Sequence, residues 1–229
     1  MPHTEPIVLS LGGSIVVPES GIDTAFLIDF AKLIKNRIKH GQRFIIIVGG
    51  GNTARIYQRA ARAVTSLADE DIDWLGIHST RLNAHLLCAV FRNQAQHRVV
   101  KDPRRALVWN RPLLIAAGWK PGWSTDYVAV RLAKKYGARR VINLSNISLV
   151  YDKDPNKFAD AKPLQITDWK SLRALVGNKW VPGMNVPFDP IAARAAEQFH
   201  MQVIVANGKD LSNLKNILSN KKFVGTIIS

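Results

Sequence analysis

The sequence predicts an α/β fold, and three observations lead to this prediction. Short apolar runs rich in β-branched residues alternate with longer segments of helical periodicity along the whole chain. Two of these apolar runs end in turns of consecutive glycines, which suit the tight connection from a strand to a helix. The length of 229 residues and the hydrophobic content of 47% suit one domain with a sizeable core.

In the first half of the chain, the expected strands are apolar runs and the expected helices carry apolar residues at a spacing of three to four. The helical pattern that begins at Ile22 stops before Gly41, a residue typical of a helix end. The expected strands are residues 7–11, 44–48, 98–100 and 113–116, and the expected helices are residues 22–38, a segment through Arg55 and Tyr57, and residues from about 73 to 92.

The second half contains clearer helix starts. Ser124 and Asp189 are typical N-cap residues, and Pro190 after Asp189 suits the first turn of a helix. Residues 151–162 are polar and contain Pro155, which predicts a loop or a small hairpin. The expected strands are residues 140–144, 203–206 and 226–229, and the expected helices are residues 124–137, 169–176, 190–199 and 211–218. No linker divides the chain, so we expect a single domain.

The chain is strongly basic, with 32 Lys and Arg against 17 Asp and Glu and a net charge of +15. Such charge attracts polyanions, whether nucleic acids or phosphorylated metabolites. The basic residues are scattered in short pairs rather than gathered in a tail, so we expect no specific nucleic-acid ligand. A single cysteine, Cys88, excludes an intrachain disulfide. No signal-peptide pattern and no apolar run of about 20 residues is present, and we therefore expect a cytoplasmic protein without a membrane span.

The two glycine turns are the strongest indication of a ligand. Gly12-Gly13-Ser14 and Gly49-Gly50-Gly51-Asn52 each follow an expected strand, where α/β proteins bind their ligands. Glycine lets backbone amides approach an anion, and a following helix adds a favourable dipole. Arg55 lies one turn into the second helix and can face the same anion. Neither turn has the spacing of a P-loop or of a dinucleotide-binding fold.

The ordered series of motifs resembles the amino-acid-kinase family, and within it the short, archaeal-like UMP kinases. The motifs, which span nearly the whole chain, are Leu11-Gly12-Gly13-Ser14, Val48-Gly49-Gly50-Gly51-Asn52-Thr53-Ala54-Arg55, Asp73-Trp74-Leu75-Gly76-Ile77 with Thr80 and Asn83, Pro121-Gly122-Trp123-Ser124-Thr125-Asp126, Ser145-Asn146, Val150-Tyr151-Asp152-Lys153-Asp154-Pro155, Asp189-Pro190-Ile191-Ala192-Ala193 and Gly225-Thr226.

The resemblance implies a three-layer αβα sandwich around a mainly parallel sheet, and transfer of a phosphate from ATP to UMP with Mg²⁺ held mainly by the ATP phosphates. It implies an acceptor half over about residues 1–140, an ATP half over about 141–229, and a homo-oligomer, by resemblance a hexamer. The implied UMP contacts are Gly50, Asp73, Lys120, Pro121, Gly122, Trp123, Ser124 and Thr125. The implied ATP contacts are Gly12, Gly13, Ser14, Gly51, Arg55, Ser145, Asn146, Tyr151 and Asp154. The implied catalytic residues are Arg55, Lys120 and Asp126, with no metal ligand from the protein.

Other interpretations of the same residues remain open. Asp126 and Asp189 can serve only as helix starts, and Tyr151 can simply pack under a hairpin. Ser10 stands where many family members have lysine, and Ser148-Leu149 stands where many have Asp-Gly. These departures leave two alternatives to a UMP kinase, which are a small-molecule binding protein without activity and a kinase for another small phosphate or carboxylate.

Overall fold

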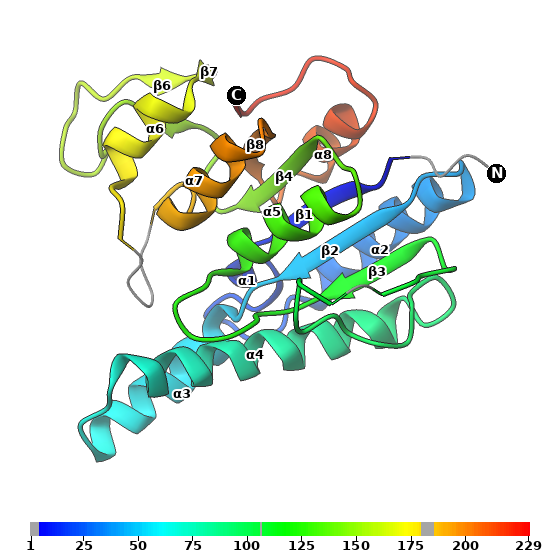
Figure 1. Cartoon of the computed structure of the whole chain (residues 1–229), viewed down its shortest axis with the longest axis horizontal. Coiled ribbons are helices and arrows are strands. Elements are labelled where there is room, and N and C mark those ends of the chain that lie inside the picture. The colour runs from blue at the N-terminus through cyan, green and yellow to red at the C-terminus, as the bar shows by residue number, and fades with distance from the viewer. Residues whose placement is uncertain (1–4, 106, 180–185) are drawn as a thin grey trace.

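The computed structural model describes residues 5–105, 107–179 and 186–229, and a seven-stranded sheet lies at its centre (Figure 1). The strand order is β3-β2-β1-β4-β8-β9-β7. The first five strands in this order are parallel to one another, whereas β9 is antiparallel to β8 and parallel to β7. The strands are β1 (Ile7–Leu11), β2 (Phe44–Val48), β3 (Leu113–Ala116), β4 (Arg140–Ser145), β7 (Ile166–Thr167), β8 (Gln202–Asn207) and β9 (Thr226–Ile228).

Helices cover both faces of this sheet, which confirms the three-layer αβα sandwich. The helices are α1 (Gly13–Val16), α2 (Thr24–Lys39), α3 (Gly51–Val64), α4 (Asp69–Val90), α5 (Thr125–Lys135), α6 (Trp169–Val176), α7 (Pro190–Gln198) and α8 (Leu211–Leu218). The core on one face joins the sheet to α5, α6 and α7, and the core on the other joins it to α1, α2, α4 and α8. Helix α3 and the first turns of α4 extend past the sheet (Figure 1).

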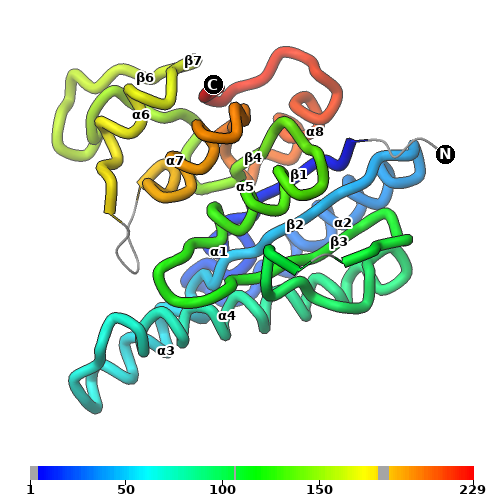
Figure 2. The backbone as a smooth tube through the Cα atoms, viewed as in Figure 1, coloured from blue at the N-terminus to red at the C-terminus, as the bar shows by residue number. Residues whose placement is uncertain are grey.

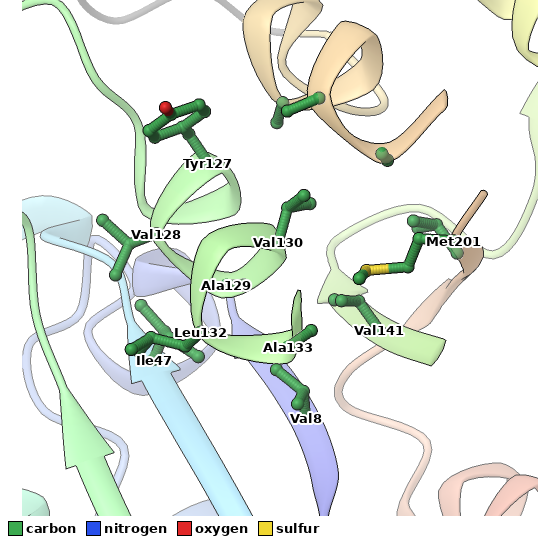
Figure 3. Packing of buried hydrophobic residues seen from close by; sticks show 14 of the residues in the cluster. Val8, Ile47, Tyr127, Val128, Ala129, Val130, Leu132, Ala133, Val141 and Met201 are labelled. Carbon is green, nitrogen blue, oxygen red and sulfur yellow. The ribbon is translucent and has the colours of Figure 1, made fainter. Parts of the chain in front are cut away.

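The central strands β1 and β2 are buried on both sides because they are apolar apart from Ser10 of β1. Every residue of β2 is buried, and its side chains alternate between the two cores, with Ile45 and Ile47 on one side and Ile46 on the other. Figure 3 shows Leu132 and Ala133 of α5 packed close to Ile47 and Val8. This packing fixes α5, and with it the loop that precedes α5, on the sheet.

Most expected elements are present, and some bounds differ. The strand expected at residues 98–100 is wrong, because this segment makes only an isolated bridge from Val100 to Ala116 and Arg98 is exposed. Helix α4 begins at Asp69 rather than at about residue 73, and the acidic first turn favours that start. The four-residue helix α1 and the two-residue strand β7 were not predicted.

A small hairpin stands beside the main sheet, as the polar segment 151–162 indicates. It pairs β5 (Val150–Tyr151) with β6 (Pro163–Leu164) in antiparallel fashion. The hydroxyl of Thr226 in β9 accepts a hydrogen bond from the Val150 amide at 2.8 Å and donates one to the Leu164 carbonyl. A three-residue strand near the end of the chain therefore attaches the hairpin to the sheet.

The sheet continues through β1 and β4, across the proposed division at about residue 140, and that division stays a prediction. Among the helices of the described residues, none has the length and apolar character needed to span a membrane.

Candidate functional site

The two glycine turns meet at the carboxyl ends of β1 and β2. These strands are parallel neighbours in register, with Leu11 paired to Val48, so the turns after them emerge side by side. Gly13 and Gly51 are in main-chain contact, since a Cβ atom on Gly13 would lie 2.0 Å from the Gly51 nitrogen. Gly51 also has a φ of +60°, which glycine adopts without strain. No other residue fits at these two positions without moving the backbone.

The amides of these turns are suited to an anion. Gly13 and Gly51 are the first residues of α1 and α3, and the first amides of a helix have no partner within it. The turn before α3 is held from below by Asn83, whose Nδ2 donates to the carbonyls of Gly49 and Gly50 at 2.9 and 3.1 Å. These carbonyls are thereby occupied. The amides of Gly12, Gly49 and Asn52 donate to backbone carbonyls, whereas no such bond is made by the amides of Gly50 and Gly51 among the described residues, so these two can meet a phosphate.

A cavity of about 270 Å³ opens next to the second turn. Its walls come from the start of α3, one face of α4, the start of α5 and the residues before α7. Figure 2 shows the course of the backbone through these elements. The lining residues are Gly50, Gly51, Ala54, Arg55, Gln58, Asp73, Gly76, Ile77, Thr80, Gly118, Trp123, Ser124, Thr125, Asp126, Val186 and Asp189. The cavity thus brings one exposed arginine, three aspartates and helix N-termini together in one place.

Two of these aspartates, the half-buried Asp126 and the buried Asp189, form a polar centre. The Oδ1 atom of Asp126 accepts hydrogen bonds from the Ser10 hydroxyl at 2.7 Å and from Asn143 Nδ2 at 3.2 Å. Asp189 is only 2% exposed, and its Oδ1 caps α7 by accepting from the Ala192 amide at 2.6 Å. Its Oδ2 is buried without a hydrogen-bond partner among the described residues.

Burial sets the protonation of both carboxyl groups. It raises the pKa of Asp126, while the hydrogen bonds from Ser10 and Asn143 oppose that rise. Burial also raises the pKa of Asp189, and the nearby charge of Asp126 adds to the effect, to about 7. At neutral pH, Asp189 is therefore divided between its neutral and its charged form, and it can respond to a cation or an anion placed in the cavity.

The loop from Gly118 to Gly122 lies beside the cavity, which Gly118 lines, and it is bonded to α4. Asp73 Oδ2 accepts from the Gly122 amide at 2.7 Å. The Lys120 ammonium lies 4.8 Å from the ring centre of Trp119 and 5.9 Å from that of Trp123. These distances suit cation–π attraction, so the two aromatic rings hold the lysine at the rim of the loop.

Of the residues expected to contact ATP, Gly51 and Arg55 line this cavity, and the others lie outside it, at or after the carboxyl ends of β1 and β4. Gly12 and Ser14 follow β1, whereas Ser145 ends the adjacent β4 and Asn146 follows it. Tyr151 lies in the hairpin strand β5, and Asp154 is exposed in the hairpin loop, where its Oδ1 accepts from the Asn156 amide. The carboxyl ends of the parallel strands explain why segments so far apart in the sequence share one edge.

The structure brings together only part of the predicted site. Of the expected UMP contacts, five line the cavity: Gly50, Asp73, Trp123, Ser124 and Thr125. Lys120, Pro121 and Gly122 lie in the loop beside it. Arg55 and Asp126 line it as expected catalytic residues. What each of these residues binds stays a prediction, because the geometry alone gives no ligand.

Sequence reasoning missed the partners of the polar centre. Ser10 and Asn143 were not predicted to take part, and Asp189 was interpreted as a helix start. A signal was present for the first two, because each is a single polar residue within an apolar strand, and they are paired neighbours in β1 and β4. A buried polar side chain in such a strand needs a partner, and here both bond to the same carboxylate.

Comparison with known proteins agrees with this geometry. The model of the amino acid kinase family matches residues 5–207. A uridylate kinase from Methanospirillum hungatei is 36% identical over 227 residues, which cover 97% of this chain and 94% of that protein. One from Thermoplasma volcanium is 34% identical and covers 98% and 97% of the two chains. The crystal structure of uridylate kinase from Archaeoglobus fulgidus superimposes with a TM-score of 0.81 at 30% identity, over 98% of this chain and all of the other.

Proposed function

The chain belongs to the amino acid kinase family, and from this premise we propose that it is a UMP kinase, an enzyme that transfers the γ-phosphate of ATP to UMP. The observation that carries the proposal is the cavity beside the paired glycine turns. It combines anion-binding amides, Arg55 and Asp73 in a chain that is similar over nearly its full length to proteins named uridylate kinase.

The reaction needs little covalent help from the protein. A phosphate oxygen of UMP is already anionic, and it attacks the γ-phosphorus of ATP while the bond from that phosphorus to the oxygen shared with the β-phosphate breaks. The products are UDP and ADP, and no general base is required. The protein must hold two polyanions in line and neutralise the charge that gathers between them.

We propose that the residues share this work by position. The amides of Gly13, Gly50 and Gly51 and the guanidinium of Arg55 face the transferring phosphate, and they stabilise its charge through a fixed set of donors. Asp73 receives a ribose hydroxyl on Oδ1, since its Oδ2 accepts from the Gly122 amide. Lys120 neutralises the UMP phosphate from the rim.

On the ATP side, we propose that Gly12, Ser14, Ser145 and Asn146 surround the phosphates and the sugar, and that Tyr151 and Asp154 reach the nucleotide from the hairpin. Their support is their position on one edge of the sheet, next to the cavity. The basic chain, with its net charge of +15, favours the approach of both nucleotides.

We also propose that Mg²⁺ accompanies ATP. The described residues contain no group of three or more His, Cys, Asp or Glu side chains suited to a metal ion, so phosphate oxygens must supply most of the ligands. The buried and unpartnered Oδ2 of Asp189 fits a cation nearby, because an oxygen of this kind is costly to leave without a positive partner. The ion would offset negative charge on the phosphates.

We further propose that the protein is a cytoplasmic homo-oligomer. The single cysteine suits a reducing compartment. An apolar groove of about 540 Å³ lies between α2 and α4, and its lining includes Ile22, Ile28, Leu86 and Val90. This groove supports association with a second copy of the chain.

The test is turnover with a panel of nucleoside monophosphates. ADP release is measured with saturating ATP and Mg²⁺ at a series of UMP, CMP, AMP and GMP concentrations. We expect kcat/KM for UMP to exceed that for AMP and GMP by at least ~100-fold, about 2.7 kcal/mol of discrimination. Purine nucleotides used as well as UMP would exclude the proposed acceptor. Binding of UMP without any ADP release would instead favour a binding protein without activity.

A further inference from the structure

The loop that carries Lys120 is bonded to one helix at three places. Asp73 Oδ2 accepts from the Gly122 amide at 2.7 Å, and Thr80 Oγ1 accepts from the Gly118 amide at 2.8 Å. The third bond runs from Arg81 Nη2 to the Trp119 carbonyl at 2.9 Å. Asp73 and Thr80 are seven residues apart, two turns of the same helix face, so one side of α4 holds both ends of the loop.

Arg81 differs from its two neighbours in where it lies. Asp73 and Thr80 line the cavity of the candidate site, whereas Arg81 lines a separate cavity together with Trp119. The arginine is half-buried, and burial lowers its pKa from the ordinary value. Its Nε is buried without a hydrogen-bond partner among the described residues. Among the described residues, the contacts of Arg81 are the hydrogen bond to the Trp119 carbonyl and a position 5.7 Å from the ring centre of Trp74. The hydrogen bond is the contact that offsets the cost of keeping this cation half-buried.

That bond orders the part of the loop that the reaction needs. The Trp119 carbonyl shares a peptide plane with the Lys120 amide, so Arg81 fixes the direction in which Lys120 leaves the backbone. The ring of Trp119 also lies 5.6 Å from that of Trp123, and Lys120 contacts both rings. Loss of the anchor would free the Trp119 ring, the Lys120 ammonium and the wall of the cavity together.

We propose that Arg81 is a positioning residue for the acceptor nucleotide, which acts through the Trp119 carbonyl without touching either substrate. This inference rests on the proposed UMP kinase function. It predicts that Arg81 sets the KM for the acceptor and leaves the KM for ATP unchanged, because the loop meets only the acceptor side of the site. A residue that merely stabilised the fold would affect both constants and the melting temperature.

The experiment compares Arg81→Met and Arg81→Gln with Arg81→Lys and with a matched control, Arg98→Met. Methionine keeps an unbranched apolar stem without a donor, glutamine keeps polarity but is too short to reach, and lysine retains a long donor. Arg98 is exposed and lines the same cavity as Arg81, and the described residues give it no hydrogen bond to the loop. Kinetic constants for UMP and ATP, melting temperature and amide hydrogen exchange are measured for each protein.

The expected result is a KM for UMP at least ~10-fold higher in Arg81→Met and Arg81→Gln, partly restored in Arg81→Lys, with the KM for ATP within about twofold of wild type. Exchange at the Lys120 amide should rise in the two loss variants and stay unchanged in Arg98→Met. A KM for UMP within twofold of wild type in a folded loss variant would overturn the proposal, as would an equal change in both constants. If the wild-type protein prefers another nucleotide, the UMP kinase function fails, and the same comparison with that acceptor still tests Arg81.

Discussion

The pH dependence of stability should come largely from Asp189, which Asp189→Asn removes. The pKa of this carboxyl is about 7 in the folded protein, against an ordinary value of 3.8. Between these two values the folded chain keeps a proton that the unfolded chain has lost, so the free energy of unfolding falls as the pH rises. The difference is about 3 pH units at about 1.4 kcal/mol each, or about 4 kcal/mol in total. Above about pH 7 both states are ionised and the loss is complete.

The assay is urea unfolding of both proteins without substrates at pH 5, 6, 7 and 8, followed by tryptophan fluorescence. From pH 5 to 8, we expect the free energy of unfolding of the wild-type protein to fall by about 2 to 3 kcal/mol relative to that of Asp189→Asn. The reason is that about two of the three pH units between the ordinary and the folded pKa lie within this range. Asparagine still caps a helix, so the bond to the Ala192 amide is retained and the difference isolates the charge.

Asp210→Asn is the matched control for this comparison. Asp210 also caps a helix, α8, by accepting from the Asn213 amide, but it is exposed and its backbone hydrogen bond lowers its pKa. The contribution of Asp210 to the free energy of unfolding is present above the ordinary pKa of the group and is lost only in acid. The pH profile of Asp210→Asn from pH 5 to 8 should therefore parallel that of the wild type. If Asp189→Asn also runs parallel to wild type within about 0.5 kcal/mol, the carboxyl is not held neutral by burial, and the reasoning is refuted.

Three further predictions concern the ligands. Arg55→Ala should lower kcat at least ~10-fold, which corresponds to about 1.4 kcal/mol of activation free energy, with little change in melting temperature. The control Arg59→Ala, one turn further along α3, should leave kcat unchanged. Equal kcat in both variants would show that Arg55 is not part of the site. Ser148→Asp with Leu149→Gly should lower the KM for ATP and leave the KM for UMP nearly unchanged in steady-state kinetics, and a destabilised protein without that gain would indicate that Leu149 is an apolar anchor. Binding to DNA or RNA should be weak and independent of sequence, and should disappear with salt in a fluorescence anisotropy titration; tight binding to one RNA at physiological ionic strength would contradict the metabolic function.

The fold was predictable from the sequence because its strands are buried on both sides. Residues 44–48 are all apolar, and only a strand within a covered sheet uses such a run. The strand expected at residues 98–100 failed for a related reason. Val99 and Val100 are buried, so the apolar pattern is real, but it reflects packing of an irregular segment against the sheet rather than pairing within it.

The candidate site was predictable only where a local signal marks it. The glycine turns carry such a signal, because the contact between Gly13 and Gly51 excludes any side chain. The bond from Ser10 to Asp126 joins residues 116 positions apart, and nothing local indicates it. Arg81 looks like any surface residue of an amphipathic helix until the loop at Trp119 is placed beside it. Contacts of this kind depend on the three-dimensional arrangement, which a pattern along the chain does not contain.

The attachment of the hairpin by β9 has a consequence for the order in which the protein can form during synthesis. Strands β1, β2 and β3 pair within the first 116 residues, so the acceptor side can begin to fold while the rest is still being made. The two hydrogen bonds that Thr226 makes to the hairpin with Tyr151 cannot form until Thr226 leaves the ribosome. The pairing of β1, β2 and β3 can therefore begin early in synthesis, whereas the hairpin gains its anchor at Thr226 only when the chain is nearly complete.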